Sequence, residues 1–184
     1  ERLVVELRKY FIEFDNTTVG FSSLNGHKNP VIQLSGHGLP TNPNIAVGDE
    51  LYTVQQVVQQ LKSLDLPSNA TIKMNICFAA CQNVPIQLPK DIVLDMFFAG
   101  NLNQLADGDS LSLLTLLSNE ISTQIPSFKG QIQGYLGAIL SQKMDGVWSK
   151  SHGFQIKAHA VKILTTEGYI LLRQKDSRVT VIFY

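Results

Sequence analysis

Short apolar segments recur along this chain, and between them lie stretches in which apolar residues follow a helical period. The apolar segments alternate between apolar and polar positions, or are bounded by Gly, Pro and Asn, as strands commonly are. A β-strand is therefore predicted for each of them. These strands are 2–7, 10–14, 30–34, 71–79 and 131–139, followed by a terminal antiparallel set at 154–164, 168–172 and 178–183.

The clearest helical period lies between residues 49 and 64. Apolar residues there recur every three or four positions, which places them on one stripe of a helix. Thr53 is a suitable N-cap, because its hydroxyl can accept a hydrogen bond from a backbone N–H of the first turn. The preceding segment, 39–48, is rich in Pro, Asn and Gly and predicts a loop or a hairpin.

Strands that alternate with helices imply βαβ units. We therefore expect a three-layer α/β/α domain, with a mostly parallel central sheet and an antiparallel C-terminal part. The length favours one domain over 1–184, since domains commonly reach about 150 residues. The chain begins with Glu1 rather than Met, which favours a module cut from a larger protein. The other predicted helices are 91–105, in which Gly100 is unfavourable, and 111–125, with Asp109 or Ser110 as its cap.

Composition narrows the class of protein. The chain carries 15 basic and 15 acidic side chains and is 44% hydrophobic, which argues against a nucleic-acid binder and against disorder. No apolar run reaches the roughly 18 residues of a membrane span. Residues 129–184 hold 8 basic and 3 acidic side chains, a bias that we attribute to a solvated face bearing lysines. Two cysteines suit a reducing compartment, with the cytoplasm favoured, or one free functional thiol.

Candidate chemistry lies where two of the predicted strands end. Gly36-His37-Gly38 follows the strand at 30–34, and Ala80-Cys81 follows the strand at 71–79. A right-handed crossover through the helix between them would make these strands parallel and, most simply, adjacent. Their carboxyl ends would then open on one edge of the sheet, where ligand crevices form in open α/β sheets. Neighbouring strands are about 4.8 Å apart, so His37 and Cys81 could face each other across a substrate bond.

A thiol and an imidazole are the groups that acyl transfer needs. The thiolate of Cys81 would be the nucleophile, and His37 would be the general acid toward a leaving amine, since imidazole titrates near neutral pH. Glycines beside His37 would let a substrate carbonyl approach the backbone, and the Gly38 N–H could line an oxyanion hole. The residue spacings fit neither a zinc site nor a dinucleotide fingerprint, and no phosphate loop is present.

The two segments PVIQLSGHG and IKMNICFAACQN resemble the signature of the caspase-like superfamily of cysteine peptidases. In that family an apolar strand ends in Ser/Gly-His-Gly, and an apolar strand ending in Ala-Cys follows about 40–45 residues later; here His37 and Cys81 are 44 positions apart. The segment QIQGYLG is similar to the next strand of the bacterial members. The resemblance covers about residues 1–140 in order of elements, although its motifs are only a handful of residues.

The resemblance implies a cysteine endopeptidase that acts on proteins or peptides without a metal or an organic cofactor, with self-processing as one outcome. It implies His37 and Cys81 as the catalytic pair and the backbone N–H groups of Gly38 and Cys81 as oxyanion donors. Caspases continue the Cys with Arg-Gly, whereas this chain has Gln82-Asn83, so aspartate specificity does not carry over. Toxin and effector members of the superfamily also suggest a host cytosol after secretion as a place of action.

Several alternatives stay open. Cys77 is interpreted as a core residue in the middle of its strand, and the later His152-Gly153 pair as a surface feature. Asp49 and Glu50 are either pocket carboxylates that favour basic substrates or, preferably, part of the first turn of the helix, where they suit its dipole. The same fold could instead serve as a non-catalytic interaction module or as a Cys-dependent hydrolase of non-peptide acyl groups.

A polyanion activator is a further partner that the toxin resemblance raises. Such an activator would bind lysines near the C-terminal strands. However, Lys157 and Lys162 are five positions apart and point to opposite faces of one continuous strand, so a single tight cluster is not expected.

Overall fold

A four-stranded mixed sheet forms the centre of the protein. The computed structural model describes residues 3–7, 10–14, 21, 26–39, 42–81, 88–106 and 112–184. The strand order is β12-β8-β7-β3; β3, β7 and β8 are parallel, and β12 pairs with β8 in the antiparallel sense. The protein is therefore of the mixed α/β class that the sequence predicts. The bounds are Val31–Ser35 for β3, Thr71–Asn75 for β7, Gln131–Gly134 for β8 and Val179–Ile182 for β12.

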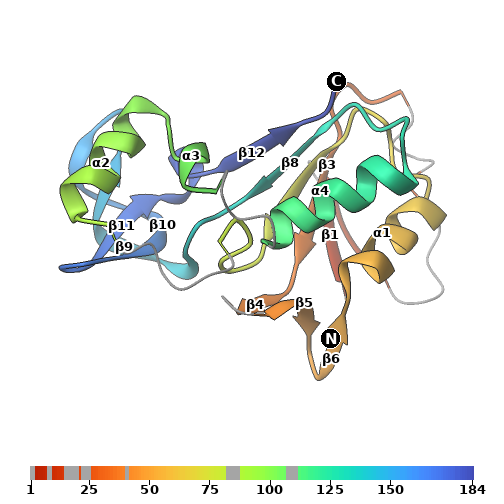
Figure 1. Ribbon diagram of the computed structural model, residues 1–184, viewed down its shortest axis with the longest axis horizontal. Coiled ribbons are helices and arrows are strands. Elements are labelled where there is room, and N and C mark those ends of the chain that lie inside the picture. The colour runs from red at the N-terminus through yellow and green to blue at the C-terminus, as the bar shows by residue number, and fades with distance from the viewer. Residues whose placement is uncertain are drawn as a thin grey trace.

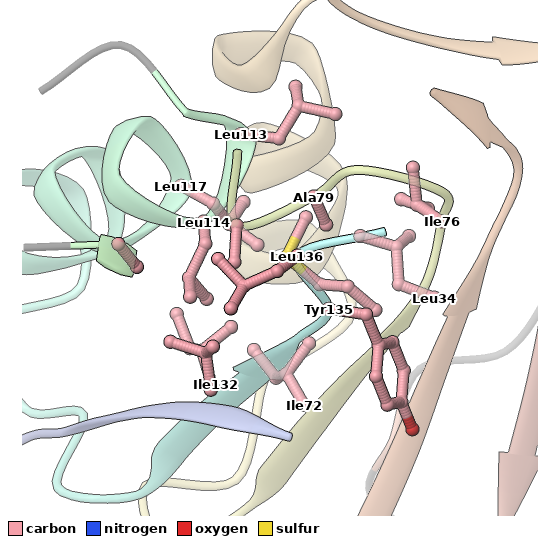
Figure 2. Packing of buried hydrophobic residues seen from close by; sticks show 14 of the residues in the cluster. Leu34, Ile72, Ile76, Ala79, Leu113, Leu114, Leu117, Ile132, Tyr135 and Leu136 are labelled. Carbon is pink, nitrogen blue, oxygen red and sulfur yellow. The ribbon is translucent and has the colours of Figure 1, made fainter. Parts of the chain in front are cut away.

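Helices α1 (Val54–Ser63) and α4 (Leu113–Gln124) pack together on one face of this sheet (Figure 1). The strands present isoleucines to them: Ile32, Ile72 and Ile132 lie side by side in register and are fully buried. Figure 2 shows leucines of α4 above this row, including Leu114 and Leu117. Burying each such side chain contributes about 1.5–3 kcal/mol, so this apolar face is the main source of stability.

The opposite face of the sheet is polar, because side chains alternate along a strand. Gln33, Lys73, Gln133 and Thr180 form one row across the four strands. We call the half-buried polar residues of these strands the polar face; they are Gln33, Ser35, Lys73, Asn75, Gln131, Gln133 and Thr180. Helices α2 (Lys90–Ala99) and α3 (Asn103–Ala106) lie farther along, beside β12 and the strands β9 to β11 (Figure 1).

Helix α1 begins later than predicted. Thr53 is its N-cap, as predicted: the hydroxyl accepts the Gln56 N–H at 3.2 Å, and the Gln56 side chain accepts the Thr53 N–H at 2.8 Å. The residues before Thr53 do not extend the helix, because Glu50–Tyr52 (β6) pair with Asn42–Val47 (β5). Within the predicted loop or hairpin at 39–48, Leu39 and Asn42–Val47 are strand residues of a small antiparallel sheet, and the apolar Leu51 of the predicted helical stretch is exposed.

The remaining helices differ from their predictions at the ends. The helix predicted over 91–105 is divided, since Gly100 takes a left-handed conformation and ends α2. Helix α4 is capped by Ser112, whose hydroxyl accepts the Thr115 N–H at 3.1 Å. The predicted caps Asp109 and Ser110 lie outside the described residues.

Three strands form a closed second region, which we call the β9–β11 unit; β10 pairs with both others in the antiparallel sense, and β11 pairs with β9 in the parallel sense. They are β9 (Ala138–Ser149), β10 (Gly153–Thr165) and β11 (Gly168–Arg173), and β11 also meets β9 through Leu172 and Trp148. The strand predicted over 131–139 is interrupted after Gly134, and its second part opens β9. The last predicted strand leaves the terminal antiparallel set: after a 3₁₀ turn, Gln174–Asp176, β12 joins the central sheet.

Two further strands stand at the amino end of the chain. β1 (Leu3–Leu7) and β2 (Tyr10–Phe14) form an antiparallel hairpin, with Leu3 opposite Phe14 and Leu7 opposite Tyr10, and β1 lies beside β3. Both strands fall where the sequence predicts them.

Candidate functional site

The strands that lead to the predicted pair are adjacent. β3 and β7 run parallel in direct register, from Val31 opposite Thr71 to Ser35 opposite Asn75. Both strands therefore end at the same edge of the sheet, which confirms the arrangement expected from a crossover through α1. His37 follows the end of β3 by two residues, and Cys81 follows the end of β7 by six.

His37 begins a short strand, β4 (His37–Leu39), that belongs to the small sheet β4-β5-β6. It pairs with Ala46, and its imidazole is exposed. The next residue must be glycine for steric reasons: a Cβ at Gly38 would lie 2.3 Å from the carbonyl oxygen of Cys77. The glycine thus lets β4 pack directly against the segment that leads to Cys81.

The segment before Cys81 is a turn and not a strand. β7 ends at Asn75, residues 77–80 turn, and Phe78 has a φ of 57°, in the left-handed region that few non-glycine residues adopt. The Cys81 N–H donates to the Phe78 carbonyl at 3.0 Å and closes this turn. The strand predicted over 71–79 is therefore confirmed only as far as Asn75, and Cys77 lies in the turn that follows it rather than in the middle of the strand.

The cysteine turn is held by the chain that follows β8. The Phe78 N–H donates to the Gly137 carbonyl, and the Ala80 N–H donates to the Tyr135 carbonyl, both at 3.0 Å. The Ile139 N–H points to the Cys77 sulfur at 3.3 Å. These bonds fix the turn between β4 on one side and the beginning of β9 on the other.

The two cysteines are not joined in a disulfide, and their surroundings differ. Cys77 is half-buried, and its sulfur lies at the first residues of β9. Cys81 is 9% exposed. The oxyanion role that the resemblance gives to the Cys81 N–H is not available in this conformation, because that group already donates to Phe78. The Gly38 N–H lies on the strand that packs against this turn.

The acidic pair Asp49 and Glu50 lies at the hairpin between β5 and β6, where both side chains are exposed. Their preferred interpretation, as the first turn of a helix, is wrong because α1 starts at Val54. The Tyr52 hydroxyl donates to the Glu50 carboxylate, and this hydrogen bond raises the pKa of Tyr52. The hairpin projects away from α4 and the central sheet (Figure 1).

The second His-Gly pair lies elsewhere. His152 is exposed in the turn between β9 and β10, and its Nδ1 is 2.6 Å from the Ser151 hydroxyl. The segment before it belongs to β9, which extends to Ser149.

Three basic residues of the C-terminal third contact three different aromatic side chains. The Lys150 ammonium lies 5.5 Å from the centre of the Phe97 ring, and that of Lys162 lies 4.4 Å from the centre of the Tyr169 ring. Arg178 bonds the Tyr135 hydroxyl at 3.3 Å. Among the described residues, no group of three or more His, Cys, Asp or Glu side chains is placed to hold a metal ion. None of the described helices is long and apolar enough to span a membrane.

Sequence reasoning missed the polar face of the sheet; Tyr135 and Arg178 lie beside its carboxyl edge, directly after β8 and directly before β12. The alternation in Gln131-Ile132-Gln133 was the available signal, since it marks a strand with one polar face. Comparisons with protein-family models, with curated proteins and with solved structures found no match.

Proposed function

We propose that this protein is a cysteine endopeptidase with a caspase-like three-layer fold, in which Cys81 is the nucleophile and His37 the general acid. The observation that carries the proposal is the contact between the two segments. Parallel neighbours β3 and β7 end at one edge, and Gly38 packs against the Cys77 carbonyl at the start of the cysteine turn. The parallel order β3-β7-β8, with antiparallel β12 at the edge, is compatible with that fold.

The reaction follows from the chemistry of the two groups. The Cys81 thiolate attacks the scissile carbonyl carbon, a C–S bond forms, and the carbonyl oxygen takes the negative charge. The His37 imidazolium gives its proton to the leaving nitrogen as the C–N bond breaks. Water then hydrolyses the thioester, releases the acid and returns a proton to His37. Of the two oxyanion donors that the resemblance implies, the Gly38 N–H is the one that lies on the strand packed against the cysteine turn.

Substrate binding must also change the cysteine turn. Cys81 is buried and its N–H donates to Phe78, so a second oxyanion donor becomes available only when that turn opens. Phe78 has a strained left-handed conformation, and such residues cost about 1–3 kcal/mol. Release of this strain would offset part of the cost of opening.

The test is covalent labelling with a peptide-like electrophile that reacts with thiols, followed by intact-mass analysis. Labelling and peptide cleavage should both disappear in Cys81→Ala, with an unchanged circular dichroism spectrum. Cys77→Ala is the matched control and should retain both, although its loss of contact with β9 lowers stability. Full cleavage by Cys81→Ala would contradict the proposal.

The histidine gives a second comparison within the chain. His37→Ala should lower kcat/KM by about 10²–10⁴-fold, the usual effect of losing a general acid or base. His152→Ala should leave the rate near that of the parent, since His152 lies in the turn between β9 and β10. Equal large losses from both variants would place the site elsewhere.

A non-catalytic interaction module is the second candidate, and the burial of Cys81 with its N–H already bonded is the observation that favours it. A Cys-dependent hydrolase of non-peptide acyl groups would use the same pair. A peptide library separates the three: a peptidase cleaves it, an acyl hydrolase labels at Cys81 without cleaving it, and a module does neither.

A further inference from the structure

Two cysteines stand at the two ends of the cysteine turn, the segment that leads from β7 to Cys81. Cys77 begins this turn, two residues after the end of β7, and Cys81 closes it through the bond from its N–H to the Phe78 carbonyl at 3.0 Å. The reaction proposed above uses the thiol of Cys81 and leaves that of Cys77 without a role. A second nucleophilic group therefore lies close to the reacting one in the chain.

The turn shortens the distance between the two cysteines. Four residues of extended strand would span about 13 Å, well beyond the roughly 4.4–6.8 Å between the α-carbons of a disulfide. The hydrogen bond between Phe78 and Cys81 instead closes a β-turn, whose first and fourth α-carbons lie within about 7 Å of each other. Phe78 directly follows Cys77, and the chain bends there because its φ is 57°. The fold therefore brings the two cysteines toward the geometry of a disulfide.

Cys77 is the more accessible of the two residues. It is half-buried, whereas Cys81 is 9% exposed. The Cys77 sulfur accepts the Ile139 N–H at 3.3 Å and lies 3.9 Å from the Ile139 carbonyl oxygen. Both contacts are to one residue at the start of β9, so rotation of the Cys77 side chain about its Cα–Cβ bond breaks them together. A small oxidant should therefore reach Cys77 first, because thiol oxidation follows exposure.

A change at Cys77 would act directly on the candidate site. Gly38 packs against the Cys77 carbonyl, since a Cβ on this glycine would lie 2.3 Å from the carbonyl oxygen, and His37 directly precedes Gly38. The same turn carries the candidate nucleophile at its other end. A bond between the two sulfurs would consume the Cys81 thiol and hold the turn closed, whereas substrate binding requires the turn to open.

We propose that Cys77 and Cys81 form a dithiol–disulfide switch, in which hydrogen peroxide oxidises Cys77 and Cys81 then completes a reversible disulfide. The disulfide follows from the two thiols and their turn, whereas its effect on activity rests on the function proposed above. The switch turns the peptidase off under oxidising conditions, and a thiol reductant restores it. The disulfide also protects Cys81 from irreversible oxidation to a sulfinic acid.

The switch closes in two steps. The Cys77 thiolate attacks one oxygen of hydrogen peroxide, so that an S–O bond forms, the O–O bond breaks and hydroxide leaves; the sulfur is oxidised to a sulfenic acid and the peroxide is reduced. The Cys81 thiolate then attacks the Cys77 sulfur. An S–S bond forms as the S–O bond breaks, and the departing hydroxide takes up a proton as water. A dithiol reductant returns both thiols by exchange.

Mass measurement detects the switch without requiring catalysis. The reduced protein is exposed to hydrogen peroxide, its remaining thiols are blocked with N-ethylmaleimide under denaturing conditions, and the tryptic peptide that ends at Lys90 and carries both cysteines is analysed. Before oxidation this peptide should carry two maleimides. Afterwards it should carry none and lack two hydrogen atoms, and dithiothreitol should reverse the change. Retention of both thiols, a disulfide between two protein molecules, or sulfinic acid as the main product would overturn the inference.

Single variants assign the order in which the thiols react. In Cys81→Ser, the sulfenic acid of Cys77 should accumulate and be trapped by dimedone. In the matched variant Cys77→Ser, trapping at Cys81 should be at least about 10-fold slower, because a buried thiol is less reactive. Equal rates of trapping in the two variants would refute the role of Cys77 as the thiol that meets the oxidant.

Variants of Phe78 test the contribution of the turn. Glycine adopts a positive φ freely, whereas a β-branched residue strongly disfavours it. In a glutathione redox buffer, the equilibrium constant for the disulfide should therefore be about 10-fold larger in Phe78→Gly than in Phe78→Val. The same constant should be smaller for the parent in urea than for the folded parent, a comparison that holds even where Phe78→Val does not fold. Equal constants in either comparison would mean that the turn does not bring the thiols together.

The two proposals fail in different ways. A disulfide that forms in a protein whose Cys81 does not react with the peptide-like electrophile would remove the peptidase and keep the switch. Peptide cleavage that the parent and Cys77→Ala lose to peroxide equally and irreversibly would remove the switch and keep the peptidase.

Discussion

The central sheet and the β9–β11 unit bury apolar residues on very different scales. A continuous cluster of large side chains begins between the sheet and its helices, with Ile72 and Leu114 among its members, and it continues into the β9–β11 unit through Ile163 and Leu172. The buried residues of the smaller cluster inside the β9–β11 unit are Val147, Ala160 and Leu171. Since apolar burial is the main source of stability, the first region should hold the fold and the second should depend on its attachment to the first.

The candidate nucleophile lies where the two regions join. The turn before Cys81 is bonded to Gly137 and Ile139, which lead from β8 into β9. After Cys81, the next residue that the structure describes is Leu88. Its carbonyl accepts the Thr166 N–H from the turn between β10 and β11. Cys81 therefore lies between two segments that are hydrogen-bonded to the β9–β11 unit. A structural change in that unit can alter the position of Cys81 through either segment.

The largest expected difference is between two neighbouring leucines of β11. Leu172 points into the main cluster and Leu171 into the small one, because successive side chains alternate. Leu172→Ala should reduce the free energy of unfolding by about 2–5 kcal/mol, as for a well-packed core site. Leu171→Ala is the same chemical change and should cost less, because the small cluster can collapse around the gap. Urea denaturation measures both, and equal losses would remove the distinction between the two clusters.

Regular periodicity made the central sheet predictable. The strands around Ile32, Ile72 and Ile132 lie where apolar alternation placed them, and the Thr53 cap was identified from its residue type. The adjacency of β3 and β7 followed from the handedness of a crossover through α1. These features are set by local pattern and by general rules of chain connection.

The site was harder to predict because pairing and packing override local pattern there. The alternation of Ile72, Met74 and Ile76 suggests a strand that continues, but Phe78 turns the chain back toward Gly137. Glu50 lies in the predicted helical stretch, yet it forms part of a strand that pairs with β5. The route of β12 back to β8 depends on a distant partner that no local signal reveals.

Gly137 offers a smaller change at the junction itself. A Cβ there would lie 2.1 Å from the carbonyl oxygen of Lys162, and neither backbone can move without disturbing its region. Gly137→Ala should therefore cost about 1–3 kcal/mol. Because the Gly137 carbonyl accepts the Phe78 N–H, hydrogen exchange at the Phe78 amide should accelerate beyond the global change.

The control for that variant is Gly153→Ala. Gly153 has a φ of 70° and no atom within 4 Å of an added Cβ, so the substitution meets backbone strain alone. Its cost should be about 1 kcal/mol, with no selective effect on the Phe78 amide. If Gly153→Ala accelerates exchange at Phe78 as much as Gly137→Ala does, the junction has no special role.

The smallest expected effect concerns the attachment of α2 to the β9–β11 unit. The Lys90 N–H, in the first turn of α2, donates to the Glu167 carboxylate at 2.8 Å, while the N-cap Pro89 supplies no side-chain bond. This hydrogen bond lowers the pKa of Glu167 below its ordinary value of 4.5. The stabilisation is therefore fully present above pH 4.5 and is lost as the pH falls through the lowered pKa.

Glu167→Gln removes the charge that suits a helix N-terminus, so its melting temperature should lie slightly below that of the parent at neutral pH. The difference should close in acid, and Asp95→Asn on the exposed side of α2 should show no such closure. A difference of the same size at pH 7 and below the lowered pKa would mean that the Glu167 charge does not anchor α2.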